Sequence, residues 1–245
     1  NVSEPTVNRF CRSMDTRGFP DFKLHLAQSL ANGTPYVNRN VNEDDSVESY
    51  TGKIFESAMA TLDHVRHSLD KSAINRAVDL LTQAKKIAFF GLGSSAAVAH
   101  DAMNKFFRFN VPVVYSDDIV LQRMSCMNCS DGDVVVLISH TGRTKNLVEL
   151  AQLARENDAM VIALTSAGTP LAREATLAIT LDVPEDTDIY MPMVSRLAQL
   201  TVIDVLATGF TLRRGAKFRD NLKRVKEALK ESRFDKQLLN LSDDR

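Results

Sequence analysis

Two short stretches rich in glycine and hydroxyl side chains are the residues of this chain best suited to bind a small anion. The first is Gly91-Leu-Gly-Ser-Ser95 and the second is Ser139-His-Thr-Gly-Arg-Thr144. Each follows an apolar run typical of a buried strand and precedes a helical pattern. In such a turn, backbone N–H groups, hydroxyls and the positive end of a helix can all approach an anion. Both stretches are therefore candidate phosphate-binding loops.

An alternating series of strands and helices must position these two loops. Apolar runs predict the strands, and helical periodicity predicts the helices between them. The expected strands are 86–91, 112–115, 133–139, 160–165 and 176–181, and the expected helices between them are 95–109, 117–127, 144–157 and 170–175. Two more helices, 193–214 and 218–233, are expected to close the fold. We predict an α/β fold with a doubly wound, flavodoxin-like, five-stranded parallel sheet and flanking helices.

A sheet of this kind with strand order 2-1-3-4-5 places its first and third strands side by side. Ligands bind beyond the carboxyl ends of those strands, where the winding reverses. One pocket should therefore collect the polar residues of both loops, namely Ser94, Ser95, Ser139, His140, Thr141, Gly142, Arg143 and Thr144. This set suits a phosphate monoester carrying further hydroxyls. Taken singly, either loop could equally be plain capping of a helix by serine.

The first loop does not have the pattern of a nucleotide site. It lacks the third glycine of the dinucleotide fingerprint, and the next expected strand, Val113-Val-Tyr115, ends without an acidic residue. A lysine-bearing phosphate loop is also missing from the chain. We therefore expect no nucleotide cofactor.

Composition describes an ordinary globular protein of 245 residues with 30 basic and 31 acidic side chains. The net charge of -1 favours no particular partner, so any nucleic-acid site must be local. No apolar run is long enough to cross a membrane and no signal-like segment is seen, which predicts a cytoplasmic protein. The three cysteines are too few for a disulfide framework, and the Cys126-Met-Asn-Cys129 pair lacks the partners of a metal site.

The amino-terminal residues predict a short helix that could read DNA. Ser3 is a suitable N-cap, and an apolar face is expected from Val7, Phe10, Cys11 and Met14. The other face carries side chains that donate to phosphates and bases, including Thr6, Asn8, Arg9 and Arg12. Such a helix fits the second helix of a helix-turn-helix motif, although a solvated helix face would have the same pattern.

The order of these features predicts five segments. The expected segments are a partial helix-turn-helix at 1–31, a linker at 32–45, connecting helices at 46–85, the α/β domain at 86–216 and a helix with a tail at 217–245. The linker prediction depends on Gly33, Pro35 and the acidic trio 43–45. Ser46 is expected to cap the first connecting helix.

The two loops resemble those of sugar isomerase (SIS) domains, which bind phosphosugars. The segment Val2-Ser3…Thr6-Val7…Arg9-Phe10-Cys11-Arg12…Gly18-Phe19…Phe22-Lys23 resembles the end of the helix-turn-helix in RpiR-type transcription factors. The two resemblances occur in the same order as in that family and cover most of the chain. The sequence begins inside the DNA-binding motif, so we expect the supporting upstream helices to be missing from it.

The resemblance implies a transcriptional regulator, mainly a repressor, of carbohydrate catabolism. Within the family it is closest to a regulator of glucose catabolism, whose effector is the phosphorylated sugar acid 2-keto-3-deoxy-6-phosphogluconate. It implies that Ser95 and Ser139 contact the effector and that Thr141 and Thr144 hold its phosphate. Ser195 and Arg196 are weaker assignments, and Ser3, Thr6, Asn8, Arg9 and Arg12 are the expected DNA-binding residues. Symmetry suggests a homodimer or a pair of dimers, with the helices around 46–69 and 193–231 as candidate interfaces.

The alternative is an aldose–ketose isomerase that acts on sugar phosphates. Such an enzyme needs an acid–base group near the substrate carbon, and His140 is the best candidate, followed by His100. His140 fits a neutral hydrogen-bonding wall of the pocket better. Several SIS enzymes carry a glutamate where Arg143 stands, and its absence favours a regulator without catalytic residues. A third reading, a purely structural oligomerisation module, predicts no stabilisation by any sugar phosphate.

Overall fold

The computed structural model describes residues 4–13, 16, 18–20, 22 and 40–230. The chain forms two compact units, which are described separately. One contains residues 1–62 together with 184–194, and the other contains residues 63–183 together with 195–245. The second unit is called the sheet domain below, and the first is called the N-terminal unit.

The sheet domain is built on five parallel strands in the order β2-β1-β3-β4-β5. The strands are β1 (Lys86–Gly91), β2 (Val113–Tyr115), β3 (Asp133–Ile138), β4 (Met160–Thr165) and β5 (Leu177–Thr180). All four neighbouring pairs are parallel. The predicted doubly wound sheet and its strand order are therefore confirmed, with strand ends within one residue of the expected positions.

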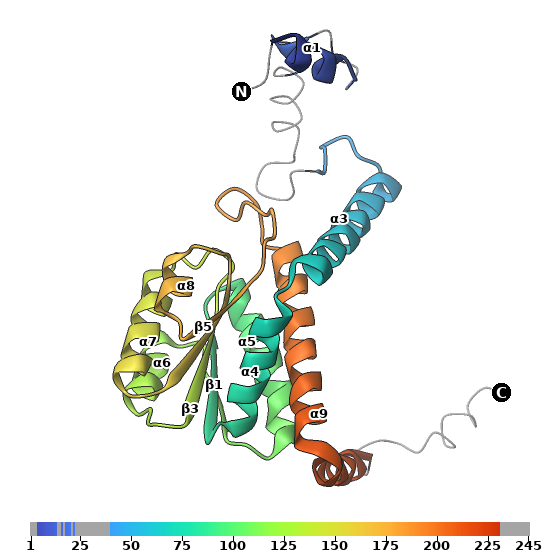
Figure 1. Cartoon of the computed structure of the whole chain (residues 1–245). Coiled ribbons are helices and arrows are strands. Elements are labelled where there is room, and N and C mark those ends of the chain that lie inside the picture. Colours follow the sequence, from blue (N-terminus) through green and yellow to red (C-terminus); the bar gives the residue numbers. More distant parts are fainter. Residues whose placement is uncertain (1–3, 14–15, 17, 21, 23–39, 231–245) are drawn as a thin grey trace, which may run out of the picture. The chain divides into compact units, whose positions relative to one another are not determined.

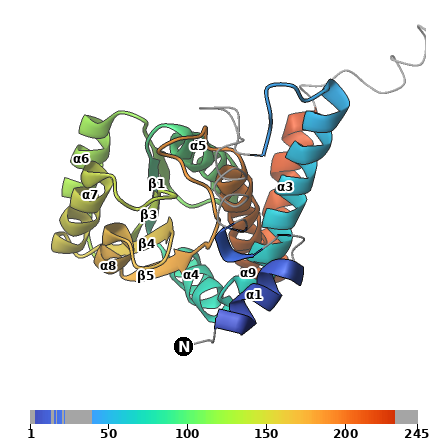
Figure 2. The same cartoon turned by 90° about the horizontal axis from the view of Figure 1, so that it is seen from above.

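Helices cover both faces of this sheet (Figures 1 and 2). On one face lie α6 (Ile119–Met127), α7 (Lys145–Glu156) and α8 (Pro170–Glu174). On the other face lie α4 (Lys71–Gln83), α5 (Ser94–Phe106) and α9 (Val194–Lys230), and a short 3-10 turn, Phe107–Phe109, follows α5. This three-layer arrangement buries both sides of the strands, which explains why the strands are continuous apolar runs without polar alternation.

The two faces of the sheet have separate apolar cores. Phe90 and Leu137 are fully buried in a cluster with Leu147 and Leu150 of α7. Phe89, whose side chain is on the opposite face, packs against Phe106 of α5 with ring centroids 5.1 Å apart. Successive side chains of a strand point to opposite faces, so each strand contributes to both cores.

The long helix α9 has a break at Gly215, where φ is 76°. Before the break, Phe210 stacks on Phe109 with centroids 4.9 Å apart, and after it Phe218 meets both rings edge-on. A positive φ is inexpensive only for glycine, so Gly215 sets the direction of the final helical segment. The structure thus agrees with the expected interruption between residues 214 and 218.

The N-terminal unit contains α1 (Glu4–Ser13) and most of α3 (Val47–Ser68). Ser46 caps α3 as expected, because its Oγ accepts the amide of Ser49 at 3.2 Å. Asp45 strengthens the same helix start through a 2.7 Å ion pair with Lys53. Hydrogen bonds from Lys53, from the Asn42 amide and from Ser49 lower the pKa of Asp45 to about 2.

The expected apolar face of the first helix is only partly buried. Phe10 of α1 is 55% exposed and meets Phe22 edge-on, whereas Cys11 beside it is buried. In α3, Val47 and Tyr50 are also exposed, by 68% and 40%. Met14, the last residue of that expected face, lies outside the described residues. Within the described part of the chain, no helix is long and apolar enough to span a membrane.

Candidate functional site

The two candidate loops leave the sheet side by side. Gly91 at the end of β1 is the register partner of Ile138 at the end of β3. The first loop continues into α5 and the second into α7. Their start points are therefore as close as two neighbouring strands, about 4.8 Å apart in a regular sheet. The position corresponds to the switch point of a doubly wound sheet, where ligands bind.

The first loop makes a tight turn that depends on its glycines. A Cβ atom at Gly91 would lie 2.6 Å from the carbonyl oxygen of Ser95, so only glycine fits there. Gly93 has a φ of 57° and precedes the first residue of α5. Ser95 is almost buried, with 9% of its surface exposed, whereas Ser94 is partly exposed.

The second loop is held by its own side chains. The Oγ of Ser139, which is 5% exposed, accepts the amide of Gly142 at 3.1 Å. The Oγ1 of Thr141 accepts the amide of Arg143 at 3.4 Å. His140, Thr141 and Thr144 are partly exposed, and Arg143 is exposed. A hydroxyl that accepts a backbone hydrogen bond can still donate its own hydrogen, so Ser139 can still donate to a ligand.

A third loop, which follows β4, holds the second loop in place by hydrogen bonds. The carbonyl oxygen of His140 accepts both the amide and the hydroxyl of Ser166, at 3.1 and 2.8 Å. The carbonyl oxygen of Gly142 accepts the amide of Leu171 at 3.1 Å. Gly142 has a φ of 58°, and a Cβ there would collide with the hydroxyls of Thr169 and Thr165. The backbone of the second loop is thus positioned before any ligand arrives.

The helices that follow the two loops differ from other helices of the sheet domain in how they begin. The first amides of α4, α6 and α8 are capped by the side chains of Asp70, Asp118 and Thr169. The N-caps of α5 and α7 are Gly93 and Thr144, and neither provides a side-chain hydrogen bond to its helix. Uncapped amides at a helix N-terminus favour an anion, because they donate hydrogen bonds and carry partial positive charge.

Gln122 of α6 is a residue at this site that the sequence analysis missed. Its Nε2 donates to the carbonyl oxygen of Gly91 at 3.2 Å and to that of Ser116 at 2.7 Å. The side chain is fully buried, and its Oε1 has no hydrogen-bond partner among the described residues. A polar residue at helical spacing between Ile119 and Cys126, on an otherwise apolar face, was the available signal. Gln122 ties the end of β1 to the β2–α6 connection.

The hydroxyl-rich run after β4 was also overlooked. Thr165 is 1% exposed, and its Oγ1 lies 3.4 Å from the Oγ1 of Thr169. Both threonines surround Gly142, and Ser166 holds His140 as described above. The sequence Thr165-Ser-Ala-Gly-Thr169 after a predicted strand has the same character as the two recognised loops, which could have revealed it.

The remaining predicted site residues lie on helices. Ser195 is the second residue of α9 and is 2% exposed. His100 lies in α5 with its ring 4.9 Å from that of Tyr115, so the structure places it against β2 and outside both loops. Burial, together with Asp117, raises the pKa of Tyr115 and keeps its phenol neutral. Among the described residues, there is no cluster of three or more His, Cys, Asp or Glu side chains that could hold a metal ion.

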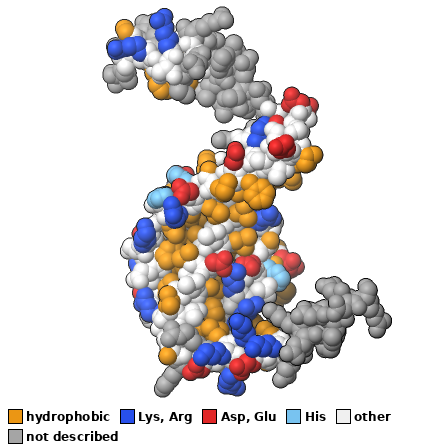
Figure 3. Space-filling view, turned by 90° about the vertical axis from the view of Figure 1, so that its right-hand side faces the viewer, with side chains coloured by type: hydrophobic (Ala, Val, Ile, Leu, Met, Phe, Trp, Pro, Cys, Tyr) orange, Lys and Arg blue, Asp and Glu red, His pale blue; other side chains and the backbone are white. Residues whose placement is uncertain are grey.

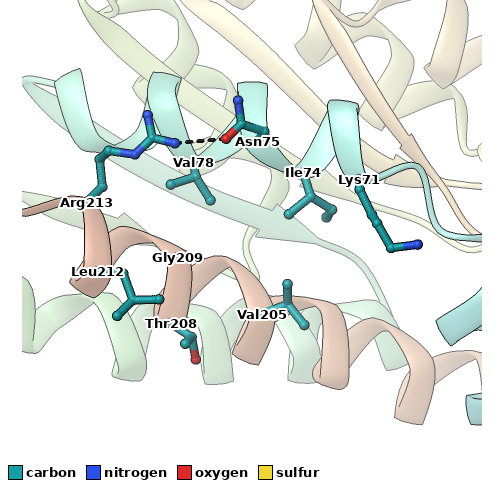
Figure 4. A pocket seen from close by; sticks show the side chains of 9 residues that line it. All are labelled: Lys71, Ile74, Asn75, Val78, Val205, Thr208, Gly209, Leu212 and Arg213. Carbon is teal, nitrogen blue, oxygen red and sulfur yellow. Dashed lines mark hydrogen bonds between the residues drawn. The ribbon is translucent and has the colours of Figure 1, made fainter.

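A groove of about 570 Å³ lies elsewhere in the sheet domain, between α4 and α9 (Figure 4). It shares no residue with the two loops and is lined by Lys71, Ile74, Asn75, Val78, Val205, Thr208, Gly209, Leu212 and Arg213. Arg213 closes one end by donating to Asn75 at 2.8 Å and by pairing with Asp79. Hydrophobic side chains are exposed on the face of the sheet domain that carries α9 (Figure 3). The groove lacks the convergent hydroxyls and amides of an anion site.

Comparison with known proteins agrees with this architecture. Residues 80–209 match the SIS domain family, and residues 1–33 match the rpiR family of helix-turn-helix domains. Vibrio vulnificus NanR, in a structure with ManNAc-6P, superposes with a TM-score of 0.69 at 24% identity, covering 96% of this chain and 83% of NanR. The sugar isomerase domain of an RpiR transcription factor from Sphaerobacter thermophilus gives a TM-score of 0.63 at 18% identity, covering 72% and 98%. The fold and the domain order define a transcriptional regulator with a SIS domain.

Sequence identity narrows this class. The transcriptional regulator HexR of Pseudomonas aeruginosa is 58% identical over 233 residues, which are 95% of this chain and 82% of that protein. The bifunctional protein glk of Paraburkholderia xenovorans is 38% identical over 93% of this chain, which spans only 36% of that longer protein. The chain therefore belongs to the RpiR family of helix-turn-helix transcriptional regulators and is of the HexR type.

Proposed function

We propose that this regulator is a repressor of carbohydrate catabolism whose DNA binding is controlled by a phosphorylated sugar acid. The effector we infer is 2-keto-3-deoxy-6-phosphogluconate, bound beyond the carboxyl ends of β1 and β3. The observation that carries the proposal is the pair of uncapped helix N-termini, α5 and α7, beside two serine-bearing loops. NanR, of the same fold, has been solved with the sugar phosphate ManNAc-6P.

The site residues have distinct roles in this proposal. Ser95 and Ser139 donate their hydroxyl hydrogens to the effector, and Thr141 and Thr144 hold its phosphate at the start of α7. Ser94, His140, Arg143 and the backbone of Gly142 complete the pocket, and Ser195 contributes from α9. Several hydroxyl and amide donors can surround one phosphate because it offers several acceptor oxygens. His140 acts here as a hydrogen-bonding wall and not as a base.

DNA recognition belongs to the N-terminal unit in this proposal. Arg9 and Arg12 are exposed on α1, and Thr6 lies on the same helix, partly exposed. Ser3 and the side chain of Asn8, the other expected contacts, lie outside the described residues. Exposed arginines on a short helix can reach phosphates and guanine edges in the major groove. A DNA-binding regulator of metabolism works in the cytoplasm, where we place this protein.

We further propose that the regulator acts as a homodimer or a pair of dimers. A twofold assembly presents two α1 helices to two half-sites, which a single reading helix cannot do. The groove between α4 and α9, where Val205 and Leu212 are 39% and 67% exposed, is a candidate contact for a second copy. Sedimentation of the unmodified protein and of Leu212→Asp tests this, because a charge in a twofold contact occurs twice and should shift the protein toward monomer.

The decisive experiment measures binding of effector and DNA together in the full-length protein. A DNA site is first selected from a random pool, and its affinity is followed by fluorescence anisotropy with and without 2-keto-3-deoxy-6-phosphogluconate. We expect a large loss of DNA affinity with the effector and no change with 2-keto-3-deoxygluconate, which lacks the phosphate. The proposal would be contradicted if the DNA affinity stayed the same with every sugar phosphate tested. The effector should be recovered unchanged by NMR, whereas turnover would favour an isomerase.

A further inference from the structure

The segment 184–194 leaves the sheet domain and belongs to the N-terminal unit. It follows β5 and Val183 and leads directly into α9, yet it groups with residues 1–62. The chain therefore passes between the two units at three points, after Leu62, after Val183 and after Val194. Two of these three crossings are the ends of this one segment.

Glu185 joins the two ends of this segment by hydrogen bonds. Its Oε1 accepts the amide of Met193 at 2.7 Å and that of Val194 at 2.9 Å. Val194 is the first residue of α9, so the carboxylate lies at the N-terminus of the longest helix of the described chain. A carboxylate that accepts two amides at this end of a helix is held by charge-assisted hydrogen bonds and by the helix dipole.

The rest of the segment is also ordered internally. The amide of Tyr190 donates to the carbonyl oxygen of Asp186 at 2.9 Å, and the amide of Asp188 donates to the Oδ1 of Asp186 at 3.0 Å. These bonds turn the chain back on itself between Glu185 and Met193. A short closed loop transmits displacement of its ends better than a slack one, because it has few internal degrees of freedom to absorb the movement.

The end of the segment adjoins a predicted effector residue. Ser195 follows Val194 and is 2% exposed, and Gln199, one helical turn later, is 3% exposed. Both residues belong to the sheet domain, where the proposed effector binds. A shift of Ser195 on effector binding would act directly on Val194, whose amide donates to Glu185.

We propose that the segment 184–194, closed by Glu185, is the element that couples effector binding to DNA binding. This proposal rests on the proposed function. Glu185 is a positioning residue in it: the carboxylate fixes the loop to the start of α9, so that a change at Ser195 is passed to the N-terminal unit. Coupling of this kind is a ratio of DNA affinities with and without effector, and it commonly reaches about 5–150-fold.

The test compares that ratio in the full-length protein and in Glu185→Ala, Glu185→Gln and Asp182→Asn. The probe is 2-keto-3-deoxy-6-phosphogluconate, and the DNA is the site selected from a random pool. Glu185→Ala should reduce the ratio to less than about twofold while each ligand alone binds within about threefold of its normal affinity. Glu185→Gln keeps an acceptor oxygen and should give an intermediate ratio. Asp182→Asn removes an exposed carboxylate three residues earlier and should change nothing.

Two outcomes would overturn the proposal. One is an unchanged ratio in Glu185→Ala, and the other is a loss of effector affinity above about tenfold without DNA, which would place Glu185 in the effector site. If Glu185→Ala does not fold, two glycines inserted between Tyr190 and Met191 decide the question. They slacken the loop and leave the Glu185 and Asp186 bonds in place, so the ratio should fall, and an unchanged ratio would overturn the idea. If the unmodified protein shows no ratio above one, the proposed function itself has failed.

Discussion

Gly91 and Ile138 are register partners at the carboxyl ends of neighbouring strands, although 46 residues separate them in the sequence. Their pairing brings the Gly91–Ser95 and Ser139–Thr144 loops to one edge of the sheet. The helix that follows each loop, α5 or α7, lacks the side-chain N-cap that other helices of the sheet domain possess. A loop whose following helix is left uncapped can give those amides to a ligand, which is the physical basis of the predictions below.

Replacing Ser95 by Ala should weaken effector binding by about 10–100-fold, as expected when one hydrogen bond to a charged group is lost. Ser139→Ala should weaken it at least as much, because the amide of Gly142 also loses its acceptor. That second loss leaves a donor unsatisfied, so Ser139→Ala should cost about 1–3 kcal/mol of stability and Ser95→Ala much less. Calorimetric titration and urea unfolding measure the two effects.

Ser125→Ala on α6 is the matched control for both variants, since it removes a hydroxyl outside the loops. It should leave effector affinity unchanged. A double variant of Ser95 and Ser139 that still binds normally would show that the effector site lies elsewhere.

Much of this arrangement was predictable from the sequence, because strand ends and turn chemistry are local properties. The runs before Gly91 and Ser139 are buried on both sides, which makes them continuously apolar, and glycine and serine mark where they stop. The polar position of Gln122 on an apolar helix face is visible in the sequence, but its contact with the end of β1 is not, since that contact depends on how α6 packs against the strand. The hydrogen bonds between Glu185 and the start of α9 likewise depend on how the chain folds back after β5.

The wrong expectation for Phe10 has a related cause. Periodicity shows that Phe10 and Val47 belong to an apolar helix face, but it cannot show whether another element covers that face. Both side chains are more than half exposed. The sequence therefore predicts which residues share a face more reliably than it predicts what covers them.

Gly142→Ala should be more destabilising than Gly93→Ala, although both glycines have a positive φ. The conformational strain costs about 1–3 kcal/mol at either position. At Gly93 a new Cβ meets nothing within 4 Å, whereas at Gly142 it would lie 2.5 Å from the Oγ1 of Thr165. Overpacking of this kind adds about 1–3 kcal/mol. Chemical denaturation of the two variants should show the difference, and equal losses would contradict the packing argument.

Gly52→Ala provides the control for these glycine variants. Gly52 lies within α3 with open space around it and no positive φ. Alanine should stabilise the helix there by up to about 1 kcal/mol, so the same substitution is expected to change sign with its environment.

The buried thiol of Cys126 should make stability fall at alkaline pH. Burial, with a smaller contribution from Cys129, raises the pKa of Cys126 to about 12. The unfolded chain loses this proton near pH 8.5–9, roughly the ordinary cysteine value, while the native state keeps it. The protonated Cys126 thiol therefore makes its full contribution to the free energy of unfolding below about pH 8.5. As the pH rises toward about 12, the free energy of unfolding falls by up to about 1.4 kcal/mol per pH unit.

Urea unfolding at about pH 8, below the ionisation of the unfolded thiol, and at about pH 9.5 and 10.5, above it, measures this slope. Cys126→Ala should be less stable at every pH because it leaves a cavity, yet its stability should decline less steeply. Equal slopes in the two proteins would show that Cys126 ionises alike in the folded and unfolded states.

Gly209 and Val78 should show compensating effects, because they bring α9 and α4 into close contact. A Cβ at Gly209 would lie 2.6 Å from Cγ2 of Val78, whose side chain is 4% exposed. Gly209→Ala therefore gains up to about 1 kcal/mol of helix propensity but overpacks this contact, with a net loss of up to about 2 kcal/mol expected. Val78→Ala opens a cavity and should cost about 1–3 kcal/mol.

In the double variant the new methyl group of residue 209 fills part of the space that Val78 leaves, so the double variant should be more stable than the sum of the single losses predicts. A double-mutant cycle by urea unfolding measures the coupling, and strict additivity would mean that the two helices move apart without cost.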